Sequence, residues 1–283
     1  MEKILGFLSH ILPMKEKRQD LKQLKTFVDT FNDNTMEEIL LKKFSYSEHS
    51  IEVILQMHMS VAIKGKQELS QVQQMEVLKK LKDKYPERVI LFVALDPNNP
   101  ECTQNFKLAF EKYGFTGVKI YPSLGYLPSH PILMEIFKVC EEKQIPIVSH
   151  CSSVCMKNSS SSLHIVGEDI DKDGNIIPFD KTIKISNKES LQFLNEPKRW
   201  LPVLMKYPNL KLSLAHFYGV DWNNFLAGKK SGVTDIIDMM YKYPNFRTDC
   251  SYTLHRNDFV DKLKEMMLEN EVIRNKILFG TDY

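Results

Sequence analysis

Residues 117–150, GVKIYPSLGYLPSHPILMEIFKVCEEKQIPIVSH, set out the repeating unit of this chain. The β-branched run at residues 117–121 predicts a strand, residues 131–143 predict a helix that starts at a proline, and residues 146–150 predict the next strand. A strand, a helix and a second strand in this order form a βαβ unit, whose two strands lie parallel in one sheet. The stretch therefore favours an α/β fold.

The same alternation continues on both sides of this unit. Further strands are predicted at residues 51–59, 89–95, 210–216, 246–250 and 276–282, and further helices at 68–85, 105–113, 196–207, 233–243 and 258–270. Strands that alternate with helices predict a parallel sheet covered by helices. A closed TIM-type (β/α)8 barrel and an open doubly wound sheet both fit this pattern. No Gly-x-Gly-x-x-Gly follows an early strand, so the dinucleotide-binding open sheet has no support.

Composition argues against several classes of protein. The chain of 283 residues has 38 Lys and Arg against 36 Asp and Glu, a net charge of +2, so a nucleic-acid partner is not expected. No apolar run approaches the roughly 20 residues of a membrane helix, so no membrane partner is expected. The 5 cysteines favour a reducing, cytoplasmic location. Leu5, Leu8 and Leu12 recur at helical spacing, which favours an amphipathic helix over a signal peptide.

A long excursion at residues 151–195 interrupts the alternation within what we expect to be a single domain spanning residues 1–283. Within the excursion, residues 169–180 (DIDKDGNIIPFD) resemble a calcium loop. However, Asp180 stands where such a loop has glutamate, and Pro178 interrupts the pattern. We therefore favour an exposed hairpin around Asp173-Gly174 and do not expect calcium there.

Three predicted strands end in residues that can bind a metal. His150 ends PIVSH, His216 ends LKLSLAH and Asp282 ends KILFGTD. In a parallel barrel these carboxyl ends gather on one face, where such folds place their chemistry. Two imidazoles and a carboxylate suit zinc, iron or manganese. Each residue could be an isolated polar residue at a strand end, but equivalent positions on three strands favour a shared metal site.

Other polar residues follow the strand at residues 117–121. Lys119 alternates with Tyr121, so both could face inward, where the lysine could act as a charge partner or, once carbamylated, as a metal ligand. The alternative is a lysine whose ammonium extends out of the barrel mouth. Tyr121, Ser123, Tyr126 and His130 are candidate substrate contacts, because they lie in the loop on the same predicted face.

Four segments together resemble the amidohydrolase superfamily, in particular its amidohydrolase-related (type 2) branch. The likeness extends from about residue 51 to residue 283 and implies a TIM-type (β/α)8 barrel with one or two metal ions at its carboxyl face. The segments are GFTGVKIYPSLGYLPSHP (114–131), IPIVSHCS (145–152), RWLPVLMKYPNLKLSLAHFYG (199–219) and KILFGTDY (276–283).

The resemblance also implies roles for individual residues. His150 matches the metal-ligand histidine of the fifth barrel strand, and His216 matches the sixth-strand histidine, a second-metal ligand or catalytic group. Asp282 matches the eighth-strand aspartate, which is both ligand and proton acceptor, while Lys119 loosely matches a bridging carbamylated lysine. The family's first strand carries a His-x-His pair, which this sequence lacks. We therefore expect an incomplete barrel, without the first strand and the last helix.

The leading hypothesis is a metal-dependent hydrolase that cleaves an ester, lactone or amide of a small organic acid with metal-activated water. Asp282 and His216 would be the catalytic residues, and zinc, as one or two ions, the expected cofactor. The first alternative is a metal-dependent non-oxidative decarboxylase of the same family. The second is an inactive barrel remnant that acts as a binding protein. The expected partner is a small-molecule substrate. Association into a homo-oligomer stays open.

Overall fold

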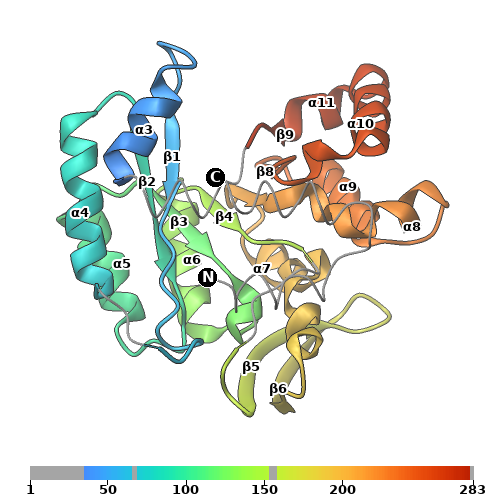
Figure 1. Cartoon of the computed structure of the whole chain (residues 1–283). Coiled ribbons are helices and arrows are strands. Elements are labelled where there is room, and N and C mark those ends of the chain that lie inside the picture. Colours follow the sequence, from blue (N-terminus) through green and yellow to red (C-terminus); the bar gives the residue numbers. More distant parts are fainter. Residues whose placement is uncertain (1–34, 66–68, 153–157, 281–283) are drawn as a thin grey trace. The chain divides into compact units, whose positions relative to one another are not determined.

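The computed structural model describes residues 35–65, 69–152 and 158–280 of the chain (Figure 1). The chain divides into two compact units, residues 1–52 with residue 283, and residues 53–282. The predicted N-terminal helix around Leu5 to Leu12 lies outside the described residues, and so does Asp282. The single domain expected from the sequence stays a prediction.

In the first unit, helix α3 (Met36–Phe44) begins with a capping box. The Thr35 hydroxyl accepts the backbone N–H of Glu38 at 3.3 Å, and the Glu38 carboxylate accepts the backbone N–H of Thr35 at 2.6 Å. Two otherwise unpaired donors are thereby satisfied at the helix start. This helix was not predicted from the sequence.

A parallel sheet forms the centre of the second unit. Its strands follow the order β1-β2-β3-β4-β7-β8-β9, and the neighbouring pairs from β2 to β9 are parallel. The sheet curls as part of a barrel (Figure 1), and β1 and β9 are its edges within the described residues. This confirms the predicted α/β fold of incomplete TIM-barrel type. The strands are β1 (Glu52–Leu55), β2 (Val89–Leu95), β3 (Gly117–Ile120), β4 (Ile147–Ser149), β7 (Leu212–Leu214), β8 (Phe246–Asp249) and β9 (Ile277–Leu278).

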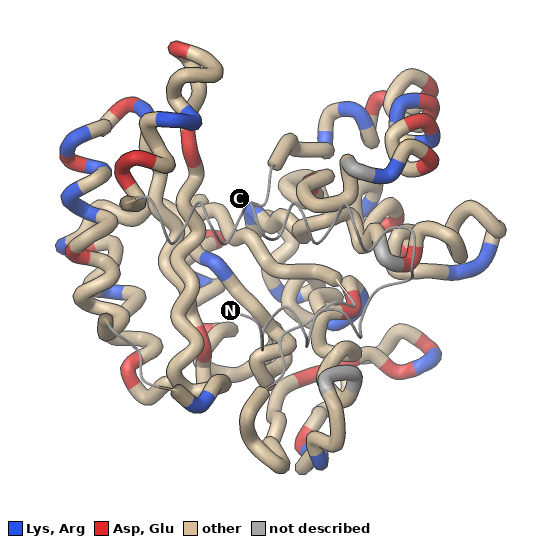
Figure 2. Tube along the Cα trace, viewed as in Figure 1, with Lys and Arg blue, Asp and Glu red and all other residues tan. Residues whose placement is uncertain are grey.

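Helices follow most of these strands and contact the sheet from one side. Helices α4 and α5 lie along β2, and α9 and α11 contact β8 (Figure 1). Charges of both signs are interspersed along α4 and α10 (Figure 2), as expected for solvated outer faces. The helices are α4 (Gln71–Lys84), α5 (Cys102–Glu111), α6 (Pro131–Glu142), α7 (Leu201–Lys206), α8 (Trp222–Leu226), α9 (Gly232–Lys242), α10 (Asn257–Glu269) and α11 (Glu271–Lys276).

The predicted helix at residues 196–207 is wrong in detail. The structure forms a 3-10 helix, η3 (Pro197–Trp200), and then the short α7. Pro202 lies in the first turn of α7 and has no N–H to continue the hydrogen bonding of the preceding turn, so the α-helix begins anew there. The short helices α8 and α11 were not predicted.

The register of the sheet separates its two faces. Residues that pair across strands share a face, and successive residues of one strand alternate between faces. One face carries a row in which every side chain is buried, namely Leu95, Ile120, Ser149, Leu214 and Thr248. The opposite face carries a row that includes charged groups, namely Ala94, Lys119, Val148, Ser213 and Arg247. Lys119 was expected to share a face with Tyr121, and extension of β3 by one residue puts Tyr121 on the face of Lys119.

The excursion between β4 and β7 contains an antiparallel hairpin of β5 (Ser162–Ile170) and β6 (Ile176–Lys184). The Asp171 carboxylate accepts the backbone N–H groups of Asp173 at 2.8 Å and Asn175 at 2.9 Å, which fixes the turn. The hairpin around Asp173-Gly174 is therefore confirmed, although its two long strands were not predicted. The Asp180 carboxylate lies 2.6 Å from Nε2 of the His164 ring across the hairpin.

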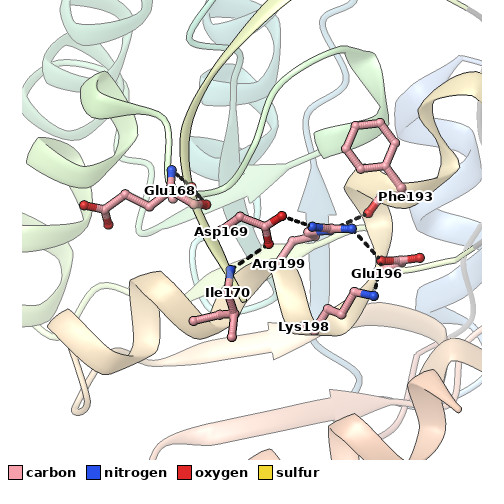
Figure 3. A network of polar contacts seen from close by, with 8 residues as sticks. Glu168, Asp169, Ile170, Phe193, Glu196, Lys198 and Arg199 are labelled. Atoms are coloured by element: carbon pink, nitrogen blue, oxygen red, sulfur yellow. Dashed lines mark hydrogen bonds and ion pairs between the residues drawn. The ribbon is translucent and has the colours of Figure 1, made fainter. Parts of the chain in front are cut away.

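An ion-pair network holds the hairpin to the 3-10 helix η3 (Figure 3). The Arg199 guanidinium donates to the Asp169 carboxylate of β5 and to the Glu196 carboxylate, the latter at 3.0 Å. Its Nε donates to the backbone oxygen of Phe193 at 3.2 Å. An apolar cluster beneath the hairpin adds to this anchor. The cluster contains the buried residues Leu127, Ile165, Ile185, Leu191 and Leu194.

Candidate metal and active site

Two histidines from neighbouring strands meet at the carboxyl face of the sheet. His150 follows β4 and His216 follows β7, and β4 pairs with β7. Nε2 of His216 lies 3.2 Å from Nδ1 of His150, and the two rings meet edge to face with centroids 5.0 Å apart. His216 is buried and His150 is half-buried. The structure therefore brings together two of the three residues predicted to bind a metal.

His216 reaches His150 through an unusual backbone turn. Extension of the register by one step places Ala215, and not His216, opposite His150. The chain then leaves the strand with left-handed conformations at His216 (φ 70°), Phe217 (φ 49°) and Tyr218 (φ 49°). Such conformations cost free energy in non-glycine residues, and they persist where surrounding contacts enforce them, often at functional sites. This turn redirects the His216 ring toward His150.

Gly219 permits the next contact of this turn. A Cβ atom at Gly219 would lie 1.7 Å from Cγ2 of Thr253 and 3.1 Å from its Cβ, so any larger residue there requires a displacement. Thr253 in turn donates from its hydroxyl to the backbone oxygen of His216 at 3.2 Å. The turn after β7 is therefore packed directly against the turn after β8.

The second nitrogen of the His216 ring faces two oxygen atoms of Ser251. Nδ1 lies 2.9 Å from the Ser251 hydroxyl and 3.2 Å from the Ser251 carbonyl oxygen. The hydroxyl itself donates to the Asp249 carboxylate. The same carboxylate oxygen accepts the backbone N–H groups of His216 at 3.1 Å and Ser251 at 3.0 Å. Asp249 ends β8, so these contacts connect the carboxyl ends of β7 and β8.

Tyr121 lies against the other side of the histidine pair. Its ring stacks on the His150 ring with centroids 4.1 Å apart and an angle of 4° between the planes. Lys119 lies two residues earlier on the same face of β3 and is buried. Both residues thus occupy the face of the sheet that bears His150. Tyr121 stands beside the site, and Lys119 lies one row deeper.

Asp96, directly after β2, falls on the same row. Extension of the register places Asp96 beside Tyr121, just as it places Tyr121 beside His150. Oδ1 of Asp96 accepts the backbone N–H of Asn98 at 2.9 Å, whereas Oδ2 is buried without a hydrogen-bond partner. Burial raises the pKa of the Asp96 carboxyl from 3.8 to about 6. The row therefore includes a buried carboxyl group whose pKa is raised by its surroundings.

The remaining predicted substrate contacts hold the loop after β3. The Tyr126 hydroxyl donates to the backbone oxygen of Leu95 at 3.0 Å and accepts the backbone N–H of Tyr121 at 2.9 Å, and its ring is buried. His130 caps α6, because its Nδ1 accepts the backbone N–H of Ile132 at 3.2 Å. Ser123 is fully buried, with no partner for its hydroxyl oxygen. Among the four predicted substrate contacts, Tyr121 is the residue whose ring stacks on His150.

Asn195 connects the loops that surround the site. Its amide oxygen accepts the backbone N–H of Ser123 at 3.1 Å, and its amide nitrogen donates to the backbone oxygen of Ser152 at 2.9 Å. The Cys151 thiol, next to His150, donates to the backbone oxygen of Asn195 at 3.3 Å. Burial raises the pKa of the Cys151 thiol well above its usual value, which fits its role as a hydrogen-bond donor.

The histidine pair fits a divalent cation. Two imidazole nitrogens at 2.0–2.1 Å from one zinc ion lie about 2.9–3.4 Å apart for octahedral to tetrahedral angles, which includes the 3.2 Å found here. Ring nitrogen Nδ1 of His216 is held by oxygen acceptors, as is usual for metal-ligating histidines. Among the described residues no group of three or more His, Cys, Asp or Glu side chains is arranged to hold a metal ion. Asp282, the third predicted ligand, is outside that set.

The family model described as amidohydrolase (Amidohydro_2) matches residues 46–283. The chain belongs to the amidohydrolase family. This match covers the whole parallel sheet and every candidate site residue. The recognition of the family from the sequence is therefore confirmed. A search of curated proteins gives no match to this family member.

Solved structures of similar fold support the barrel architecture of this family member. A TIM-barrel protein from Bordetella bronchiseptica shares 14% identity at a TM-score of 0.57, over 90% of this chain and 72% of that chain. A 5-carboxyvanillate decarboxylase from Sphingomonas paucimobilis shares 12% identity at a TM-score of 0.51, over 86% of this chain and 71% of that chain. A 5-carboxyvanillate decarboxylase from Novosphingobium aromaticivorans, with bound manganese, shares 15% identity at a TM-score of 0.50, over 98% and 77%.

Asp96, Asp249 and Ser251 were not predicted from the sequence as site residues. Asp96 and Asp249 carried the signal used for His150, because each stands at the carboxyl end of a predicted strand. Ser251 carried no such signal, since its role depends on the turn between β8 and the helix that follows.

No helix of the described residues is both long and apolar enough to span a bilayer.

Proposed function

We propose that this protein is a metal-dependent enzyme that hydrolyses an ester, lactone or amide bond of a small organic acid. The convergence of His150 and His216 at 3.2 Å, with Nδ1 of His216 held by Ser251, carries the proposal. The family match supports it. When bound there, a divalent cation supplies Lewis-acid chemistry, which lowers the pKa of water or polarises a carbonyl oxygen.

The chain's own residues take distinct parts in this proposal. His150 and His216 hold the cation, with Asp282 as the third ligand and as the base that accepts a proton. Gly280, two residues before Asp282, packs close to Ser251. Tyr121 presents its ring beside His150, where it would contact an organic substrate. Lys119, buried on the same face, would supply positive charge or a further ligand.

Non-oxidative decarboxylation is the second candidate. Two solved structures of similar fold are 5-carboxyvanillate decarboxylases, and one of them holds manganese. The flat stack of Tyr121 on His150 would suit an aromatic carboxylate that continues the stack. In that reaction, His150 and His216 again hold the cation, and Asp282 or His216 moves the proton. Zinc is our expected metal for hydrolysis, and manganese is the alternative.

Product analysis separates these reactions. The full chain is loaded with zinc or manganese and incubated in ¹⁸O-labelled water with a panel of esters, lactones, amides and hydroxylated aromatic acids, including 5-carboxyvanillate. One ¹⁸O atom in a released acid indicates hydrolysis, whereas carbon dioxide without ¹⁸O transfer to an acid product indicates decarboxylation. His150→Ala is the control, which should lose either activity. If neither metal supports turnover of any substrate although both bind, the chain is a binding protein and both proposals are wrong.

A cytoplasmic location and a small-molecule substrate remain part of this proposal. They rest on the charge balance and the cysteine content of the sequence and on the family match. Self-association stays open.

A further inference from the structure

We propose that Asp249 and Ser251 are positioning residues that hold His216 in one neutral tautomer, with the proton on Nδ1 and the lone pair of Nε2 directed at His150. The inference deepens the proposed function, because only an unprotonated Nε2 can bind a cation or accept a proton. It concerns the chain without metal, so it can be tested independently of any activity.

The direction of each hydrogen bond leads to this tautomer. The Ser251 hydroxyl has a single hydrogen, which it donates to the Asp249 carboxylate. Its oxygen, 2.9 Å from Nδ1 of His216, can then only accept. The Ser251 carbonyl oxygen, 3.2 Å from the same nitrogen, is also an acceptor. Two acceptors therefore face Nδ1, and the proton of a neutral ring belongs on that nitrogen.

The opposite nitrogen is then free to accept. Nε2 of His216 lies 3.2 Å from Nδ1 of His150, so in the metal-free chain the His150 ring donates to it. A cation between the rings would replace that hydrogen. Both His216 and Ser251 are about 5% exposed, so bulk water does not compete for these bonds. The second partner of a metal-ligating histidine usually fixes its tautomer and orientation in this way.

The Asp249 carboxylate also fixes the backbone that presents the ring. One of its oxygens accepts the backbone N–H groups of His216 and Ser251 in addition to the hydroxyl. These bonds join the left-handed turn at His216 to the turn at Tyr252 (φ 62°). The same carboxylate thus orients the His216 ring in space and determines which ring nitrogen carries the proton.

Loss of Asp249 should have a specific effect. Without its acceptor, the Ser251 hydroxyl can turn its hydrogen toward Nδ1 of His216, which favours the tautomer with the proton on Nε2. Asp249→Asn retains an oxygen acceptor of the same shape and should keep the original tautomer. Ser251→Ala removes the hydroxyl but keeps the carbonyl acceptor, so it should also keep that tautomer. In the Ser251→Ala background, Asp249→Ala should no longer shift the proton, because no hydroxyl remains to turn.

The test is ¹⁵N–¹H correlation spectroscopy of the full chain, labelled with ¹⁵N-histidine, free of metal and at a pH where the imidazoles are neutral. His216→Gln assigns the signals. We expect a protonated Nδ1 and an unprotonated Nε2 for His216 in the wild type, Asp249→Asn, Ser251→Ala and the double variant. Asp249→Ala alone should show signals of protonated Nε2. Zinc affinity, measured by competition with a chromophoric chelator, should fall about 10–100-fold in Asp249→Ala and less than about threefold in Asp249→Asn.

The results distinguish control of the His216 tautomer by Asp249 and Ser251 from a merely structural role of these residues. They also separate this control from the proposed reaction. A wild-type His216 with its proton on Nε2 overturns the proposal even if the Asp249→Ala variant does not fold. A folded Asp249→Ala protein that keeps the proton on Nδ1 also overturns it, as does an equal shift in the presence and absence of the Ser251 hydroxyl. If the tautomer behaves as expected but no substrate is turned over, the positioning role of Asp249 and Ser251 stands and the proposed function fails.

Discussion

Nε2 of His216 lies 3.2 Å from Nδ1 of His150 although the two residues are 66 positions apart in the sequence. The convergence has two causes, the order of the strands in the sheet and the backbone conformation after β7. Strands β4 and β7 are adjacent in the sheet, because the hairpin between them forms a separate two-stranded sheet and adds no strand to the barrel. The left-handed turn after β7 then rotates His216 back toward His150. This turn and its supports are therefore the most direct targets for mutation.

Gly219→Ala should destabilise the protein through a clash with Thr253. The new Cβ would lie 1.7 Å from Cγ2 of Thr253, and overpacking of this kind costs about 1–3 kcal/mol. Thr253→Ser removes that methyl group and keeps the hydroxyl that bonds the backbone of His216. Urea unfolding of both single variants and of the double variant should show that Thr253→Ser recovers most of the loss. A double variant no more stable than Gly219→Ala would show that the contact with Thr253 is not the cause.

Asp96→Asn should stabilise the protein in a pH-dependent manner. The pKa of Asp96 is raised from 3.8 to about 6, so the unfolded chain loses its proton at lower pH than the folded chain does. The wild type therefore loses stability as pH rises from about 4 to about 6, by up to about 3 kcal/mol, and the loss persists above pH 6. Asparagine does not titrate.

Unfolding free energies at pH 4, 5, 6 and 7 check this expectation. The difference between Asp96→Asn and the wild type should change in favour of the variant over this range and then level off. Asp258→Asn is a suitable control, because hydrogen bonds from Arg256 lower the pKa of the exposed Asp258 below 3.8, so its difference from the wild type should stay nearly constant between pH 4 and pH 7. A difference for Asp96→Asn that does not vary with pH would contradict the raised pKa.

Arg199→Gln should loosen the hairpin. The guanidinium, about 13% exposed, joins Asp169 of β5 to Glu196, and its loss leaves a largely buried carboxylate unpaired. We expect a loss of about 2 kcal/mol, between the values for exposed and buried ion pairs. Amide hydrogen exchange should accelerate in β5 and β6 more than in β3. Lys198→Gln, which removes an exposed partner of the same Glu196, is the matched control and should cost less than about 0.5 kcal/mol. Equal effects of the two substitutions would assign no special role to Arg199.

Asp282→Asn and His150→Ala should separate the roles of base and ligand. An amide oxygen can still coordinate a metal but cannot accept a proton, so Asp282→Asn should retain much of the metal and lose at least about 100-fold in turnover. His150→Ala removes a ligand, so metal content and turnover should fall together. Elemental analysis and product formation are measured on both variants. Near-normal turnover of Asp282→Asn at full metal occupancy would exclude Asp282 as the base.

The local pattern of the sequence was sufficient for the sheet and for the position of its functional face. The apolar run at residues 89–95 and the alternation around residues 117–150 predicted β2, α6 and β4 closely, because hydrophobic periodicity depends on near neighbours. Parallel strands place their carboxyl ends on one face, so His150 and His216 could be assigned to one site without coordinates. The same rule applies equally to Asp96 and Asp249, which also stand at the carboxyl ends of strands.

Only the tertiary structure decided how these residues are used. The hairpin strands β5 and β6 are stabilised by the distant Arg199 and by an apolar cluster, and periodicity within 151–195 does not report those contacts. Strand alternation alone would turn the His216 side chain to the side of the sheet opposite His150. The turn that corrects this is enforced by Asp249 at the end of β8 and by Ser251 and Thr253, which follow β8. The amino-acid sequence thus determined which residues reach the carboxyl face, because that depends on local order. The orientation of the His216 ring was decided by hydrogen bonds to residues more than 30 positions away, which form only once the sheet has assembled.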